Sequence, residues 1–194
     1  MRPASGASDR LFCRMPTPLR PALAALAAAP LTTTVRRLWK ALTPDERLAG
    51  ISAALSDDPE GWVKAQTRTA IAAALKFRPQ TVATWPRQKL VSEAARLPLD
   101  DTPLLSAYIV DLHLGHRRPM MGAFLDALGI PNEDGRIDAE NVEVPVQDAA
   151  KVKSTADALV TKFPREEVVT YFLTLLLQDA AVWAATEEWL TAQV

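Results

Sequence analysis

The sequence predicts an all-α protein, a compact bundle of roughly seven to nine helices packed around a buried helix near the carboxyl end. The first observation is composition: the 194 residues contain 33 alanines against 7 glycines, and alanine is the strongest helix former whereas glycine is among the weakest. The second is spacing, because apolar residues recur three and four positions apart through most of the chain. The third is the position of the prolines, which stand where helices are expected to begin.

The expected helix starts carry capping residues. Thr43–Glu46 reads as a capping box, in which the threonine hydroxyl and the glutamate carboxylate each accept a backbone N–H. Asp101–Pro103 and Asp58–Glu60 repeat the arrangement of an acidic residue followed by proline. Gly129 is suited to end the preceding helix in the left-handed conformation. Helices are therefore expected near 35–57, 60–97, 103–129, 147–162 and 165–192.

The segment from Val168 to Leu177 is apolar on nearly every side. A helix of that kind is buried in a protein core or lies in a membrane. A membrane span needs about 20 apolar residues, and here the charged residues Arg165 and Asp179 stand on either side. The segment is therefore expected to be the central core helix, and no membrane span is predicted. On this basis Leu175→Asp is expected to unfold the protein, because an unpaired buried charge costs several kcal/mol.

The predicted domain organisation is simple. Residues 1–17 are expected to form a disordered lead, because prolines, serines and a glycine break any helical period there. Residues 18–194 are expected to form a single helical domain. A basic lead before an alanine-rich stretch also outlines a targeting peptide, but the stretch is only weakly apolar and a cytoplasmic location is expected. A short α-solenoid of stacked helical pairs is the alternative architecture, although no fixed repeat period is found.

Composition and motifs narrow the classes of protein. One cysteine, Cys13, allows no intrachain disulfide and no cysteine-based zinc site. The formal net charge is −1, so no global field draws the protein to nucleic acid or to a membrane. The sequence has no glycine-rich phosphate loop, no Gly-x-Ser-x-Gly and no Glu-x-x-His. No catalytic residue, metal site or cofactor is assigned, and a non-catalytic role is favoured over an enzyme.

The small net charge hides a strong segregation of charge along the chain. Residues 62–99 hold seven basic side chains against one acid, whereas residues 138–194 hold ten acids and four bases. Aromatic residues interleave with the basic ones in what we call the basic aromatic hairpin, residues 62–96. The favoured function is a non-catalytic helical interaction module that meets a protein partner, or a second copy of the chain, through this hairpin. The residues expected to bind the partner are Lys76, Arg78, Trp85, Arg87 and Lys89.

Two other interpretations of the basic aromatic hairpin remain open. Cations interleaved with aromatic rings are typical of surfaces that bind phosphate or single-stranded nucleic acid. Such binding weakens steeply as salt is added. Alternatively, the hairpin packs internally against the acidic C-terminal half, with its long basic side chains lying over apolar surface.

His113 and His116 are the only histidines, and they give a third hypothesis, a metal-dependent protein. Three positions apart on a helix, they share a side, and two imidazoles at that spacing can chelate one ion. A zinc or iron site needs further ligands, and Asp111 points away from both imidazoles. The apolar stripe that ends at Leu112 instead predicts that His116 lies beside the core and His113 on the flank.

Residues 130–141 match part of the pattern of a calcium-binding EF-hand loop, including Asn132, Asp134 and Gly135. The match fails at two ligand positions, where Ile130 replaces the opening aspartate and Asn141 replaces the bidentate glutamate. The favoured interpretation is a turn in which Gly135 takes a positive φ angle.

Overall fold

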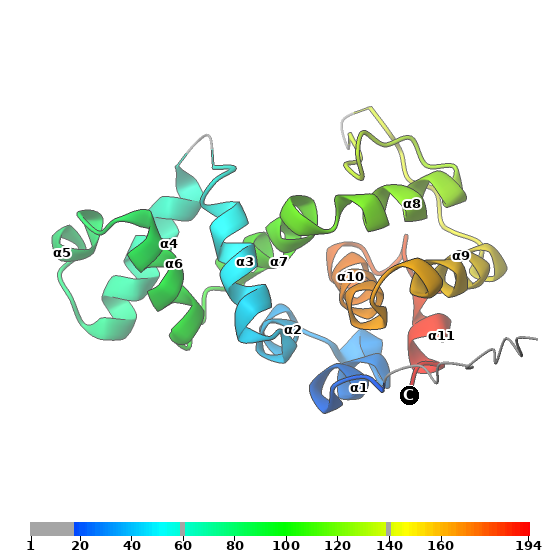
Figure 1. Ribbon diagram of the computed structural model, residues 1–194, viewed down its shortest axis with the longest axis horizontal. Coiled ribbons are helices and arrows are strands. Elements are labelled where there is room, and N and C mark those ends of the chain that lie inside the picture. Colours follow the sequence, from blue (N-terminus) through cyan, green and yellow to red (C-terminus); the bar gives the residue numbers. More distant parts are fainter. Residues whose placement is uncertain (1–17, 59–60, 139–140) are drawn as a thin grey trace, which may run out of the picture.

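The computed structural model describes residues 18–58, 61–138 and 141–194. Within these ranges it contains helices and no strand, as predicted (Figure 1). The helices are α1 (Pro21–Ala27), α2 (Val35–Ala41), α3 (Pro44–Ala54), α4 (Trp62–Leu75), α5 (Pro79–Ala83), α6 (Arg87–Arg96), α7 (Thr102–His116), α8 (Arg118–Leu128), α9 (Ala149–Lys162), α10 (Arg165–Gln178) and α11 (Ala185–Thr191), with a 3-10 turn at Pro30–Thr32.

The described residues form 11 α-helices, more than the roughly seven to nine that the sequence predicts. One reason is that the helix expected over 165–192 is two helices. After Gln178 the backbone of Asp179 is extended, with φ −151° and ψ 95°. Its Oδ1 accepts the backbone N–H groups of Ala181 and Val182, both at 3.0 Å. Asp179 thereby replaces helical hydrogen bonds with a side-chain turn, and the chain changes direction before α11.

Three of the predicted caps are confirmed, and the one at Asp58 differs. Helix α4 begins after Gly61, and the Asp58 carboxylate accepts the backbone N–H of Lys64 at 2.8 Å. The Thr43 hydroxyl accepts the backbone N–H of Glu46 at 3.1 Å, and the Glu46 carboxylate accepts that of Thr43 at 2.8 Å. Asp101 caps α7 by accepting the backbone N–H of Leu104. Gly129 ends α8 in the left-handed conformation, with φ 76°. These local signals account for where three of the helices begin or end.

Helix α10 is the buried helix that the sequence predicts near the carboxyl end. Helices α1, α2, α7, α9 and α11 pack around it. Leu175, which the sequence placed at the centre of the core, is only partly buried because it faces a cavity. The fully buried residues of α10 are Val168, Val169, Thr170, Tyr171, Phe172, Leu173, Thr174 and Leu176.

Helix α7 connects the two ends of the molecule, since it packs against α10 and α8 on one side and against α3 and α4 on the other. Glycines allow α3 and α7 to approach closely. A Cβ atom on Gly50 would lie 2.5 Å from the carbonyl oxygen of Tyr108, and one on Gly115 would lie 2.8 Å from the Cβ of Ala53. Because real Cβ atoms do not come that close, this crossing requires both glycines.

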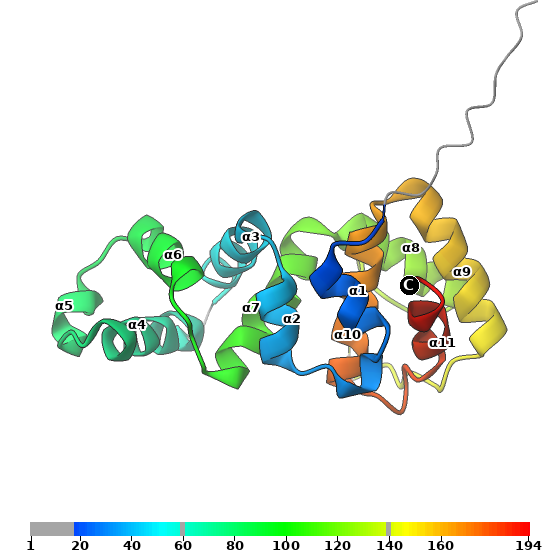
Figure 2. The ribbon, with the colours of Figure 1, turned by 90° about the horizontal axis from the view of Figure 1, so that it is seen from below.

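Helices α4, α5 and α6 form a smaller lobe at one end of the molecule, while α8 to α11 lie at the other end (Figures 1 and 2). The lobe packs on the rest of the chain through α3 and α7. Its buried side chains Ile71, Val82 and Leu90 belong to the same connected core as the residues of α10. The core is therefore continuous from the lobe to the C-terminal helices.

The segment between α8 and α9 contains a tight hairpin turn. Glu133 and Arg136 exchange two backbone hydrogen bonds of 2.8 and 2.9 Å. Between them Asp134 has φ 50° and Gly135 has φ 80°, which is the pattern of a two-residue type I′ turn. A Cβ on Gly135 would lie 2.8 Å from that of Met121, so the hairpin lies directly on α8. The predicted positive φ of Gly135 is confirmed.

Two further sequence predictions concern the N-terminal lead and a membrane-spanning helix. The predicted lead, residues 1–17, and with it Cys13, lies outside the described residues. Among the helices that are described, none combines the length and the apolar character needed to cross a bilayer.

Candidate functional site

Four of the five residues predicted to bind a partner gather where α4, α5 and α6 meet. We call the surface formed by Lys76, Phe77, Arg78, Trp85 and Lys89 the cationic tip. Its shape follows from the end of α4, where Lys76 takes the left-handed conformation with φ 55°. The next residue, Phe77, then closes the helix end through a 2.9 Å hydrogen bond from its backbone N–H to Ala72. This turn sends Phe77 and Arg78 outward.

The aromatic rings of the cationic tip are held against one another. Phe77 and Trp85 meet edge to face, with ring centroids 5.9 Å apart and an interplanar angle of 80°. The Lys89 ammonium lies 3.7 Å from the centroid of the Trp85 ring, an attractive cation–π geometry. Phe77 is still 47% exposed. The tip therefore offers apolar ring surface and positive charge side by side.

The cations of the tip have no acidic partner among residues 18–58, 61–138 and 141–194. Within the part of the chain that the structure describes, no ion pair involves Lys76, Arg78 or Lys89. The only acid of residues 62–99, Glu93, lies 3.9 Å from Arg96. The interpretation that the hairpin packs against the acidic C-terminal half is wrong, because the two lie at opposite ends of the molecule (Figure 1). Lys76, Arg78 and Lys89 are all exposed, so their charges face solvent.

Arg87, the fifth predicted residue, is used differently. Its Nη2 donates to the Ser52 carbonyl oxygen at 2.6 Å and to the Ser52 hydroxyl at 3.2 Å, and it also bonds the hydroxyl of Ser56. Arg87 therefore ties the start of α6 to α3. The structure does not bring it together with Trp85 and Lys89.

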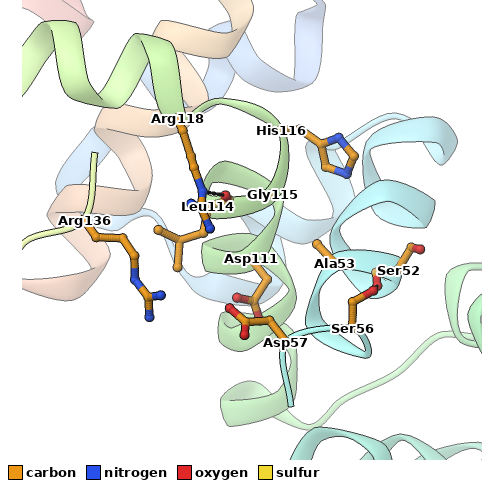
Figure 3. A pocket seen from close by; sticks show the side chains of 10 residues that line it. All are labelled: Ser52, Ala53, Ser56, Asp57, Asp111, Leu114, Gly115, His116, Arg118 and Arg136. Carbon is orange, nitrogen blue, oxygen red and sulfur yellow. Dashed lines mark hydrogen bonds between the residues drawn. The ribbon is translucent and has the colours of Figure 1, made fainter. Parts of the chain in front are cut away.

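A second concave site lies between α3, α7 and the 133–136 hairpin, with a volume of about 470 Å³ (Figure 3). The carboxylates of Asp57 and Asp111 lie on one side of it, and the guanidinium of Arg136 lies apart from them (Figure 3). The other polar residues of the lining are Ser52, Ser56, His116 and Arg118. No described residue forms an ion pair with Asp57 or Asp111. The pocket therefore holds charges of both signs that the protein leaves open to solvent.

Asp111 is the residue of this pocket whose pKa is shifted. Burial raises the pKa of its carboxyl to about 6, the nearby carboxylates of Asp57 and Asp58 push in the same direction, and Arg136 opposes them. Asp111 thus titrates close to neutral pH. Sequence reasoning did not assign the site, because Asp57 and Asp111 stand far apart in the chain and only the crossing of α3 and α7 brings them together.

The two histidines lie in different surroundings, opposite to those predicted. His113 is 2% exposed, and its Nε2 lies 3.0 Å from the Thr174 hydroxyl of α10. His116 is exposed and lines the Asp57–Asp111 pocket. Burial, with a smaller contribution from the cation of Arg117, holds the pKa of His113 well below its usual value. The imidazole of His113 is buried and neutral, whereas that of His116 is exposed in the pocket, so the two do not face a shared metal position.

Two potential ligands in the loop 130–141, Asn132 and Asp134, are already engaged. The side-chain oxygen of Asn132 accepts the backbone N–H of Gly135 at 2.9 Å. The carboxylate of Asp134 pairs with Arg118 at 3.2 Å. Within the described residues no cluster of three or more His, Cys, Asp or Glu side chains could hold a metal ion, while Glu140 of this loop lies outside the described residues. The turn interpretation agrees with these hydrogen bonds.

Comparison of the chain with models of protein families, with curated proteins and with solved structures found no match.

Proposed function

We propose that the protein is a non-catalytic helical interaction module that binds an acidic segment of a protein partner through the cationic tip. The observation that carries the proposal is the absence of any described acidic partner for Lys76, Arg78 and Lys89. Charges that are not neutralised within the chain remain available for a partner.

The tip also suggests the chemistry of the acidic segment. Phe77 and Trp85 provide apolar ring surface next to the cations, and aromatic anchors contribute strongly to protein interfaces. A segment with carboxylates spaced around one or two apolar side chains would match both features. A second copy of the chain is the competing occupant, because residues 138–194 carry ten acids and four bases at the other end of the molecule.

Single-stranded nucleic acid is a second candidate partner, favoured by a specific observation. Trp62, at the start of α4, is 41% exposed and Phe77 is 47% exposed, and exposed rings beside cations are what unstacked bases and phosphates bind. Against it, the net charge of −1 means that no field beyond the lobe would assist binding.

The test compares two labelled probes on the full chain by fluorescence anisotropy. One probe is a peptide of glutamates interspersed with leucine and tryptophan, and the other is single-stranded oligothymidine. The triple variant K76E/R78E/K89E is expected to lose at least about tenfold in affinity for the peptide, since each rim charge contributes a fraction of a kcal/mol and the reversal doubles the effect.

The matched control is K40E/K153E/K162E, which changes the net charge by the same amount with exposed lysines outside the lobe. The control is expected to bind the peptide like the natural chain. Equal losses in both variants, or no peptide binding, would overturn the proposal. Stronger binding of oligothymidine, lost in Trp62→Ala, would favour the nucleic-acid candidate.

The remaining parts of the proposal follow from the sequence. A cytoplasmic location is proposed because the single cysteine allows no intrachain disulfide. The metal-dependent alternative through His113 and His116 gains no support from the positions of the two imidazoles. Elemental analysis of the purified protein that found a stoichiometric transition metal would revive it.

A further inference from the structure

We propose that a cavity between α7, α8, α10 and the segments 135–137 and 142–144 binds a small apolar carboxylic acid, with Arg136 as the counter-ion of the carboxylate. The cavity has a volume of about 480 Å³, within the range of small-molecule sites. It lies in the C-terminal body, away from the cationic tip, so the proposal is independent of the proposed function.

The walls of the cavity determine the apolar part of the ligand. Val110 of α7, Leu125 of α8 and Leu175 of α10 line it, together with Val142 and Val144 from the segment before α9. Apolar walls release water to an apolar ligand and cannot solvate a charge. The body of the ligand is therefore a hydrocarbon chain or an aromatic ring.

Gln178 and Asp179 also line the cavity, and Asp179 Oδ1 is already held by the backbone N–H groups of Ala181 and Val182. Two other hydrogen-bond donors of the lining have no acceptor among the described residues, and they determine the polar part of the ligand. Arg136 forms no side-chain hydrogen bond or ion pair with any described residue, and neither does the hydroxyl of Tyr171. Burial raises the pKa of Tyr171 well above its usual value, so the phenol stays protonated as a donor. A carboxylate accepts hydrogen bonds only, and it accepts two from one guanidinium.

The backbone fixes Arg136 in place. It closes the type I′ hairpin, whose Asp134 and Gly135 both have positive φ, and the hairpin lies against α8 because Gly135 has no side chain. The guanidinium starts from a rigid turn, which reduces the entropy lost when a ligand binds.

His113 shows where the carboxylate does not bind. The Thr174 hydroxyl donates to the Thr170 carbonyl oxygen at 2.8 Å, so its oxygen accepts from His113 and the Nε2 of that imidazole carries the proton. The other nitrogen, Nδ1, is then an unprotonated acceptor, buried and without a partner. A carboxylate beside it would meet a second acceptor, so the inner part of the cavity takes the apolar end of the ligand.

The experiment uses decanoate and the uncharged decanol as probes, with binding to the full chain measured by isothermal titration calorimetry. Trp183, which lines the cavity, supplies a second readout through its fluorescence, assigned with Trp183→Phe. We expect saturable binding of one decanoate per chain and weaker binding of decanol. Arg136→Gln is expected to lose about tenfold or more for decanoate and to bind decanol unchanged, as for a charge-assisted hydrogen bond.

Lys40→Gln is the matched control, because it removes an exposed cation of α2 that neither lines the cavity nor belongs to the cationic tip. It is expected to bind decanoate like the natural chain. The proposal is overturned if decanoate shows no saturable binding, if decanol binds as tightly, or if Arg136→Gln and Lys40→Gln lose affinity equally. Because binding of the acidic peptide is measured separately, failure of either proposal leaves the other standing.

Discussion

Arg117 and Glu46 form a buried ion pair, in which Arg117 Nη2 donates to Glu46 Oε1 across 2.6 Å. Arg117 is only 5% exposed. The other oxygen of Glu46 accepts from Arg20 at 3.0 Å, and Arg20 pairs with Glu166 at 2.6 Å. The network thus joins α3, the junction of α7 and α8, the start of α1 and the start of α10.

Glu46→Gln is expected to destabilise the protein by about 2–4 kcal/mol. The amide preserves the shape of the side chain but removes the nearer counter-charge of the buried Arg117 guanidinium, which then keeps only the Glu167 carboxylate at 3.8 Å. Losing one partner of a buried ion pair is costly. Urea denaturation followed by circular dichroism measures the change. Glu188→Gln, at an exposed position of α11, is the control and should shift stability by less than about 0.5 kcal/mol. Equal losses of unfolding free energy in the two variants would show that the Arg117–Glu46 pair stabilises the protein no more than an exposed carboxylate does.

The Arg117–Glu46 pair also predicts that folding stability depends on pH under acidic conditions. Burial alone would raise the pKa of Glu46, but the backbone N–H of Thr43 and the cations of Arg117 and Arg20 outweigh it and hold the pKa below its ordinary value of 4.5. A lowered pKa in the folded state contributes stability that is complete above the ordinary pKa and is lost as pH falls through the folded one. Thermal melts below about pH 4.5 should therefore fall more steeply for the natural chain than for Glu46→Gln.

Asp111 predicts a pH dependence of the opposite sign, a loss of folding stability as the pH rises toward neutrality. Its folded pKa of about 6 lies above the ordinary value of 3.8, so the folded state binds the proton more tightly and loses stability as pH rises between these two values. Asp111→Asn removes the penalty and is expected to stabilise the protein at pH 7.5 by about 1–2 kcal/mol, less than the full shift implies because the carboxyl is partly exposed. At pH 4 the two proteins should melt alike. A destabilised variant at pH 7.5 would contradict the unpaired state of this carboxylate.

Gly50→Ala is expected to destabilise the protein by about 1–3 kcal/mol, because the new Cβ would lie 2.5 Å from the Tyr108 carbonyl oxygen and two packed helices must separate. Gly122→Ala is the matched control. It lies inside α8, and its Cβ would meet nothing closer than 3.6 Å, so it should be neutral or stabilising through the helix propensity of alanine. Chemical denaturation of both variants checks the contrast.

The core of α10 predicts different effects at two positions that lie on different faces of the same helical turn. Leu173 is fully buried, so Leu173→Asp is expected to abolish cooperative unfolding. Leu175 is partly buried and faces the cavity, so Leu175→Asp should leave a folded protein with lowered stability, rather than the unfolded chain that the sequence predicts. Thermal unfolding followed at 222 nm, a standard helix signal, distinguishes the two results, and unfolding of both variants would show that the cavity is closed.

The sequence predicted features that depend on neighbouring residues and missed those that depend on distant ones. The capping box at Thr43, the cap at Asp101 and the positive φ of Gly135 are local, and all three are confirmed. The Asp57–Asp111 pocket depends on the crossing of α3 and α7, for which the sequence gives no local signal. The fold class was therefore predictable, and this site was not.

The reversal of the two histidines has a simpler cause. The buried positions of α7 occur in adjacent pairs, Leu104 with Leu105 and Tyr108 with Ile109. Continued by four residues, the pairing gives Leu112 with His113, which are the buried residues observed. The spacing of these buried pairs thus predicts that His113 is buried. The prediction for His116 was wrong because it extended only the first residue of each pair.

The placement of the basic lobe and the acidic helices at opposite ends gives the molecule a permanent dipole moment along its long axis (Figure 1). A polyanion approaching from the side would exert a torque that turns the basic lobe toward it before contact. Rapid, salt-sensitive encounter with a negatively charged surface then becomes compatible with a chain whose total charge is nearly zero.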